Sequence, residues 1–185
     1  ISDIVQDQTG KLWMGNWTGI LSFNPAIGAS SIQRYDNTNT VYPGGRATDI
    51  DVAPDGSVWS SVLSVTWGFG GLVRYQPQTN TWTFWGNGDN SNGWPRYAVS
   101  CDNVSVQPKK NGGYLVWIHS DAIGKMIVFD SNTQLFSELP NNGRKGEIYN
   151  LPGKTCTDAQ GNLYALRFAN PGEPFSLDAR DVSGK

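Results

Sequence analysis

The chain has 185 residues, of which 38% are hydrophobic and only 16% are charged, and its formal net charge is −2. A chain of this length can bury a sizeable core, and a charge so close to zero gives no basic field of the kind that nucleic-acid-binding proteins present. No run of about 20 apolar residues occurs, so the sequence predicts no membrane span. No segment shows a convincing 3.6-residue periodicity, so we expect an all-β protein with minimal helix.

The first predicted repeat covers residues 1 to about 46. It reads ISDIVQDQTGKLWMGNWTGILSFNP at its start, with a strand-like opening, a glycine turn and a second strand that carries Trp13. The stretch resembles the repeat of two-component-regulator-type propellers, which have an Ile-rich first strand, an acidic residue, a glycine turn, Leu-Trp-Ile-Gly-Thr and Gly-Leu. The counterparts in this sequence are Ile4, Asp7, Gly10, Leu12, Trp13, Met14, Gly15, Gly19 and Ile20.

The second predicted repeat covers residues 47–100 and contains four short runs rich in β-branched and aromatic residues. They are Thr48–Val52, Ser57–Val62, Gly71–Tyr75 and Thr81–Trp85. Pro-Asp-Gly at positions 54–56 predicts a tight turn between the first two. Four alternating runs joined by turns indicate a four-stranded antiparallel meander. The sequence Pro-Asp-Gly-Ser-Val-Trp resembles the virginiamycin B lyase-like propeller family.

The same unit recurs along the chain. Gly10–Trp13 is repeated as Gly56–Trp59, 46 residues later, then more loosely as Gly113–Trp117 and Gly161–Tyr164. Repeats of roughly 40–50 residues with four strands each are typical of β-propellers. We therefore predict four-stranded antiparallel blades at about 1–46, 47–100, 101–150 and 151–185, the last incomplete. Three full blades and a partial fourth favour part of a larger propeller over a four-bladed ring.

Several residues are candidates for covalent modification. Cys101 and Cys156 lie near the starts of successive repeats, so we expect a disulfide between blades; two buried reduced cysteines are the alternative. Asn16 and Asn103 each begin an Asn-x-Ser/Thr sequon. Asn16 is the better placed of the two, because Asn103 falls in a predicted inner strand. Low charge and sequons favour an extracellular or periplasmic protein.

Three aromatic side chains in predicted loops are candidates for ligand contact. They are Trp67, Phe69 and Trp94; aromatic residues flanked by glycine can stack on a sugar or a peptide, although capping a hydrophobic core is the commoner role. The polar loop around Asp89 alternates oxygen-bearing side chains but lacks the glycine and glutamate positions of a calcium loop, so we predict no metal there.

The sequence predicts no catalytic site, cofactor or metal. His119 is the one histidine. The activity that the lyase resemblance implies would need a constellation of His and Glu side chains, which this sequence does not supply. We therefore expect a non-catalytic module for binding or scaffolding, with a protein or glycan ligand. Two alternatives stay open: a structural subunit that assembles through open blade edges into a ring or fibre, and a lyase-like enzyme whose site lies on further blades. Further blades or self-association are expected in each case.

Overall fold

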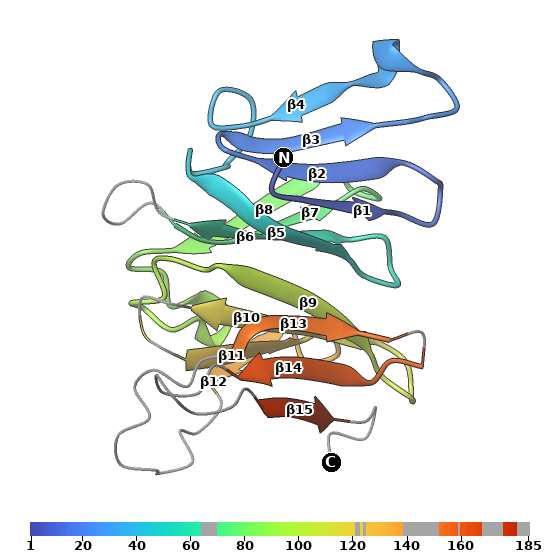
Figure 1. Cartoon of the computed structure of the whole chain (residues 1–185). Coiled ribbons are helices and arrows are strands. Elements are labelled where there is room, and N and C mark those ends of the chain that lie inside the picture. The colour runs from blue at the N-terminus through green and yellow to red at the C-terminus, as the bar shows by residue number, and fades with distance from the viewer. Residues whose placement is uncertain are drawn as a thin grey trace.

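The computed structural model of the chain describes residues 1–63, 70–120, 123, 125–138, 152–158, 160–167 and 176–180 (Figure 1). Its regular structure consists of strands and two single 3₁₀ turns, η1 (Ala29–Ser31) and η2 (Ser91–Gly93). The strands form four antiparallel sheets of consecutive strands. Three sheets have four strands, and the last has three within the described residues. The prediction of an all-β protein built from four-stranded antiparallel blades is confirmed.

The four sheets are named blades 1 to 4 in chain order. The strands of blade 1 are β1 (Asp3–Gln6), β2 (Leu12–Asn16), β3 (Gly19–Phe23) and β4 (Gln33–Tyr35); of blade 2, β5 (Arg46–Val52), β6 (Val58–Leu63), β7 (Gly71–Gln76) and β8 (Thr81–Gly86); of blade 3, β9 (Asn103–Pro108), β10 (Tyr114–Ser120), β11 (Lys125–Asp130) and β12 (Leu135–Glu138); and of blade 4, β13 (Pro152–Thr157), β14 (Leu163–Arg167) and β15 (Ser176–Arg180).

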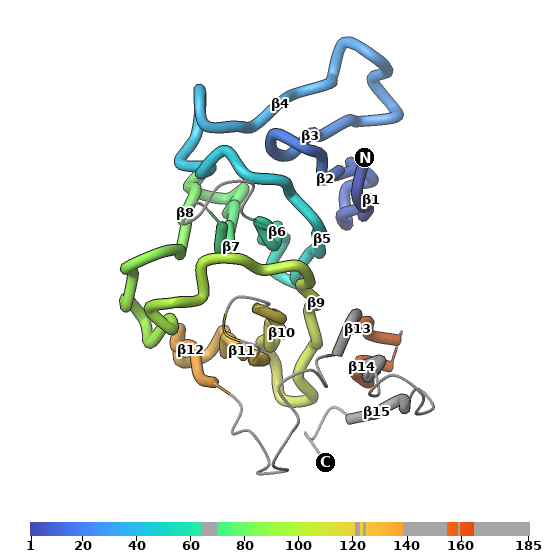
Figure 2. Tube along the Cα trace, turned by 60° about the vertical axis from the view of Figure 1, so that its left-hand side comes forward, coloured from blue at the N-terminus to red at the C-terminus, as the bar shows by residue number. Residues whose placement is uncertain are grey.

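The blades stand side by side in an arc, with blade 1 at one end and blade 4 at the other (Figure 1). The first strands of the blades, β1, β5, β9 and β13, follow one another along one side of the arc, and the last strands, β4, β8 and β12, lie on the opposite side (Figure 2). Each blade therefore has an inner edge formed by its first strand. Each also has two faces, which turn toward the blades before and after it.

The turns between first and second strands explain the repeated glycines. Gly10, Gly56 and Gly161 have φ values of 84°, 80° and 82°, a left-handed conformation that favours glycine. In blades 1 and 4 an aspartate opens the turn and accepts backbone hydrogen bonds within it: Asp7 from Thr9 at 2.9 Å, and Asp158 from Gln160 at 2.9 Å. The short motif Asp-x-x-Gly therefore encodes the turn and fixes the register of the strands that follow it.

The register confirms that the repeated aromatic residues are equivalent. Trp13, Trp59, Trp117 and Tyr164 all lie on the second strand of their blades. Each is paired with the same first-strand position, which is occupied in turn by Val5, Asp51, Ser105 and Cys156. Residues in different blades are therefore equivalent when they lie the same number of positions from this pair.

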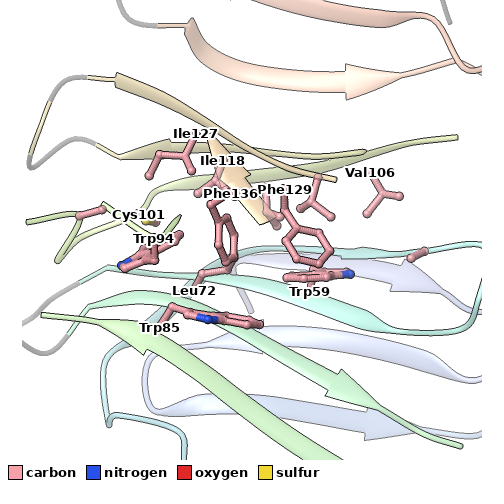
Figure 3. Close-up of a cluster of buried hydrophobic side chains, with 14 of the residues drawn as sticks. Trp59, Leu72, Trp85, Trp94, Cys101, Val106, Ile118, Ile127, Phe129 and Phe136 are labelled. Atoms are coloured by element: carbon pink, nitrogen blue, oxygen red, sulfur yellow. The ribbon is translucent and has the colours of Figure 1, made fainter. Parts of the chain in front are cut away.

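The hydrophobic core lies between the blades. At the junction of blades 2 and 3, Trp59 packs on Phe129 with ring centroids 4.9 Å apart, and Trp85 packs edge-on against Phe136 at 5.1 Å (Figure 3). Blades 1 and 2 meet in the same way, with Trp13 5.4 Å from Tyr75. Because side chains alternate along a strand, each blade contributes one face to the core before it and the other face to the core after it.

Candidate functional site

The inner edge of the arc carries a regular row of polar side chains. Asp3 of blade 1 accepts a hydrogen bond from the Ile50 N–H of blade 2, and Asp49 of blade 2 accepts one from the Val104 N–H of blade 3, both at 3.1 Å. Asn103 of blade 3 accepts in turn from the Thr155 N–H of blade 4, again at 3.1 Å.

These three acceptors occupy one register position. Each lies two residues before the residue paired with the second-strand aromatic side chain. The donors are equivalent to one another too. Since an edge strand presents unpaired N–H groups, each blade satisfies an inner-edge N–H of the next with an Asp or Asn side chain. We call this the inner-edge acceptor position.

The polar row is buried and continuous between blades 2 and 4. Asn103 donates to the Asp49 carboxylate at 2.5 Å and accepts from the Thr155 hydroxyl at 2.5 Å. The Thr155 hydroxyl also lies 2.8 Å from Ser105 Oγ, and Ser105 donates to the Thr155 carbonyl at 2.7 Å. All four side chains are buried. Their hydrogen bonds link blades 2, 3 and 4 in one buried network.

Asp51, on the same edge, has a carboxyl whose pKa lies above its ordinary value. Burial raises the pKa of the carboxyl to about 6, although hydrogen bonds from the Val106 and Val52 amides lower it, and the negative charge of Asp3 adds to the rise. The Val106 N–H donates to Asp51 Oδ2 at 2.7 Å, again joining blade 2 to blade 3.

The second-strand aromatic residues mark a second row. Trp13 donates its indole N–H to Asp7 at 2.8 Å, Trp117 donates to Gln107 at 2.9 Å, and Tyr164 donates to Asp158 at 3.1 Å. Blade 2 differs, because Ala53 stands six residues before Trp59, where blade 1 has Asp7 six residues before Trp13. The buried Trp59 indole N–H accordingly has no acceptor within the described residues.

These bonds also set the pKa of the two aspartates. Burial tends to raise the pKa of Asp7, but hydrogen bonds from Thr9, Trp13 and Lys11 outweigh it, and the pKa is lowered overall. The pKa of Asp158 is lowered by its hydrogen bond from the Asn162 side chain, with further bonds from the turn and from Tyr164. Both carboxylates are thus charged structural acceptors.

No three His, Cys, Asp or Glu side chains come together as a metal site within the described ranges. His119 is buried near the end of β10, and its Nδ1 lies 2.5 Å from Asp102 Oδ1. Asp102 directly precedes β9, whose Asn103 is paired with His119. The pair therefore ties the two strands of one blade together at their ends.

The structure corrects the predicted disulfide. No disulfide joins Cys101 and Cys156; Cys101 is buried and Cys156 is exposed. Cys156 is paired with Tyr164, so its equivalent in blade 3 is Ser105, four residues beyond Cys101. Four residues of strand span about 13 Å, so the two cysteines do not occupy equivalent positions in their blades. This offset cannot be predicted from sequence spacing, because it depends on the register of the strands.

The two sequons differ sharply in accessibility. Asn103 is fully buried and both ends of its amide are hydrogen-bonded, so it is not available as a glycan carrier in the folded chain. Asn16 lies at the end of β2 in a partly exposed position, where its Oδ1 accepts from the Thr18 N–H at 2.8 Å. Its glycosylation stays a prediction.

The prediction that Trp94 is a ligand-contacting loop residue is not supported by its position. Trp94 is buried and packs edge-on against Phe136 at 5.0 Å, so it belongs to the core between blades 2 and 3 (Figure 3). The exposed ring of the same connection is Tyr97, which no sequence pattern distinguished from its neighbours. Trp67 and Phe69 lie outside the described residues.

The two rims of the arc are built differently. One rim, on the right in Figure 1, carries the five-residue turns between first and second strands and the links between third and fourth strands. The opposite rim, which we call the loop rim, carries the β2–β3 turn (17–18) and the longer connections 36–45 and 87–102. Loops positioned by a rigid scaffold are where binding residues concentrate.

Among the described residues, the loop rim presents two exposed aromatic rings, each with an arginine beside it. The Trp17 side chain is 66% exposed, and the Arg46 guanidinium lies 4.6 Å from its ring centroid. Tyr97 is 67% exposed, and the Arg96 guanidinium lies 5.9 Å from its ring centroid. An aromatic face with a cation above it is a ready contact surface for a polar or anionic partner.

Radially adjacent four-stranded antiparallel blades, with first strands innermost, define the β-propeller fold. No family model matches the chain, and no curated protein matches it. Its structure is similar to the extracellular domain of the hybrid two component system BT4673 from B. thetaiotaomicron, with a TM-score of 0.60, 12% identity and coverage of 95% of this chain and 21% of that one.

Two further solved structures illustrate the range of propellers that share the fold. A gluconolactonase from Xanthomonas campestris has a TM-score of 0.58 and 14% identity, over 98% of this chain and 58% of that one. A chain of a nidogen/laminin complex has a TM-score of 0.59 and 13% identity, over 95% of this chain and 59% of that one. The chain thus spans less than two thirds of each, and identities this low establish the fold alone.

Proposed function

We propose that this chain is a non-catalytic propeller module that binds a protein or glycan partner through its loop rim, in an extracellular or periplasmic setting. The proposal rests on the exposed rings of Trp17 and Tyr97, which lie on one rim and each have an arginine beside them. These two large exposed rings have no role in the described core of the arc. Exposed aromatic and arginine side chains are the residue types that dominate binding energy at interfaces.

The inner edge of the arc also favours a binding module. Its carboxylate and amide oxygens accept hydrogen bonds from the backbone of the next blade, so they are committed to holding the arc together. In the part of the chain described, no cluster of metal-ligating side chains accompanies them. This favours binding over the lactonase activity named for one structural neighbour and over a lyase site on these blades.

Two structural neighbours support the proposed setting. One neighbour is an extracellular domain, and another is part of a protein–protein complex. No helix among the described residues is long and apolar enough to cross a membrane. Protein or glycan partners outside the cytoplasm are consistent with these similarities, and they are the partners to test first.

The test compares ligand profiles of matched variants. The probes are a displayed random peptide library and a glycan array, applied to the wild-type chain and to Trp17→Ala, Tyr97→Ala and Ile27→Ala. Ile27 is a comparably exposed apolar side chain in the β3–β4 connection, on the rim opposite the loop rim, and serves as the control. We expect the rim variants to lose at least about tenfold in affinity for the selected probes, and Ile27→Ala to bind as wild type.

Two results would overturn the proposal. One is a set of ligands that bind equally well to the Trp17 and Tyr97 variants, because the contact surface would then lie elsewhere. The other is turnover of gluconolactone by the purified chain with added divalent cations, which would point to an enzyme. Thermal unfolding of each variant distinguishes lost binding from lost folding.

A further inference from the structure

The faces between blades follow one pattern, repeated at each junction. The face of blade 2 that covers blade 1 and the face of blade 3 that covers blade 2 carry apolar residues at the same register positions. The equivalent pairs are Ile50 and Val104, Val58 and Val116, Val73 and Ile127, and Tyr75 and Phe129. All eight side chains are buried against the preceding blade.

Blade 1 carries the same apolar pattern on a face that no described element covers. The equivalents of those four positions are Ile4, Leu12, Leu21 and Phe23, and Met14 lies among them, paired with both Ile4 and Leu21. We call these five residues the open face. Ile4 is 55% exposed, whereas Ile50 is 3% exposed. None of the five belongs to a core cluster, although Val5, Trp13 and Ile20 on the other face do.

The inner edge of blade 1 is incomplete in the same way. The amides of Ile50, Val104 and Thr155 each donate to the acceptor side chain of the preceding blade. The equivalent amide in blade 1 is that of Ile4, which points away from β2 because hydrogen-bonded pairs alternate along an antiparallel ladder. Among the described residues no side chain is placed to accept from it. An exposed face and an exposed donor thus occur together.

We propose that the open face and the Ile4 amide bind one further propeller blade, whose first strand carries Asp or Asn at the inner-edge acceptor position and whose second strand carries an aromatic residue. The occupant is specified by the three junctions within the chain. Blades 1, 2 and 3 offer Asp3, Asp49 and Asn103 to the blade that follows, together with Trp13, Trp59 and Trp117. A blade of this kind supplies both missing partners.

The occupant is not blade 4, whether of this chain or of a second copy. The inner-edge acceptor position of blade 4 is Lys154, since it lies two residues before Cys156, which is paired with Tyr164. A lysine ammonium group donates hydrogen bonds and cannot accept one from an amide. Head-to-tail association of two copies would therefore bring no Asp or Asn to the inner-edge acceptor position that precedes the Ile4 amide. The chemistry selects a blade of the type of blades 1 to 3.

A tandem chain tests the proposal directly. Residues 1–46 are duplicated in front of Ile1 of the full chain, which reproduces the 46-residue spacing between Asp3 and Asp49. We expect the amide of the original Ile4 to exchange with solvent at least about tenfold more slowly than in the 1–185 chain. Asp3→Asn in the added copy keeps an acceptor oxygen and retains the protection, whereas Asp3→Lys in the added copy removes it.

Each other outcome counts against the proposal. Equal exchange of Ile4 in the tandem and in the 1–185 chain shows that the open face does not take a blade. Loss of protection in the Asn variant as well as the Lys variant removes the role of the acceptor position. If sedimentation shows that the 1–185 chain dimerises and Ile4 is protected in the dimer, then a second copy is the occupant and the choice of partner is wrong.

Discussion

Blades 1 and 2 present the same kind of face in two different environments. Ile50 and Tyr75 of blade 2 are buried beneath blade 1, whereas their equivalents in blade 1, Ile4 and Phe23, belong to a face with no cover among the described elements. The sequence pattern of the two faces is alike, so the difference lies in the neighbour and not in the blade. In a propeller, the apolar pattern of a blade therefore encodes an interface, which becomes core only when another blade covers it.

The largest expected difference is between Phe129→Ala and Phe23→Ala, two changes at one register position. Phe129 is buried between blades 2 and 3 and contacts Trp59 and Phe136. Its truncation leaves a cavity and should lower the free energy of unfolding by about 3–5 kcal/mol. Phe23→Ala should cost about 1 kcal/mol or less, because Phe23 is only partly buried. Denaturant unfolding of both variants measures the contrast, and equal losses would show that the open face is covered.

Asp49→Ala should give the next largest effect. It removes the acceptor of the Val104 amide and of the Asn103 side chain, which are both buried. Buried donors left without partners should cost about 2–3 kcal/mol of unfolding free energy. Asp49→Asn keeps one acceptor oxygen and should cost less. If the alanine variant unfolds at the wild-type denaturant midpoint, the inner-edge row does not hold the blades together.

A pH effect of comparable size is expected from Asp51. Its folded pKa of about 6 lies above the unfolded value of 3.8, so the folded chain holds this proton more tightly. This stabilising contribution of the protonated carboxyl is present below about pH 4 and is lost as the pH rises through 6; the difference between the two pKa values corresponds to about 3 kcal/mol. Asp51→Asn should abolish this part of the pH dependence and be the more stable chain at pH 7. The measurement is the denaturant midpoint of unfolding between pH 4 and 7. Midpoints that fall in parallel for the wild-type chain and Asp51→Asn would show that Asp51 is not the titrating group.

The smallest expected effect is that of a charge on the open face. Ile4→Lys should change the unfolding free energy of the 1–185 chain by no more than about 0.5 kcal/mol, because the side chain is already largely in water. In the tandem chain the same change in the original Ile4 should be strongly destabilising. Thermal denaturation of the 1–185 chain and of the tandem chain, each with and without the change, makes the comparison. A large loss of stability in the 1–185 chain would mean that Ile4 is already packed.

The fold could be predicted because its signals are local. The glycine turns and the aromatic residues three or four positions later give the second strand of every blade, and the structure places Trp13, Trp59, Trp117 and Tyr164 there as expected.

The site could not be predicted to the same extent, because its contacts depend on register between blades. Asp3, Asp49 and Asn103 become equivalent only when residues are counted back from the position paired with the aromatic side chain. Cys101 and Cys156 looked equivalent by repeat number and are four residues out of register. Trp94 stands in a connection whose composition suggests exposure, but its ring fills a gap beside Phe136. Such packing depends on three-dimensional fit and leaves no periodic signal.

Amide hydrogen exchange in the 1–185 chain tests the central claim most directly. The comparison is internal: Ile4 with Val5 in β1, and Ile50 with Asp51 in β5. Val5 and Asp51 donate within their own sheets, whereas Ile50 donates to Asp3 of the preceding blade. We predict that Ile4 exchanges far faster than Val5, while Ile50 and Asp51 are similarly protected. Fraying of β1 would accelerate the amide exchange of both Ile4 and Val5. A monomeric chain in which Ile4 is as well protected as Val5 would contradict the account.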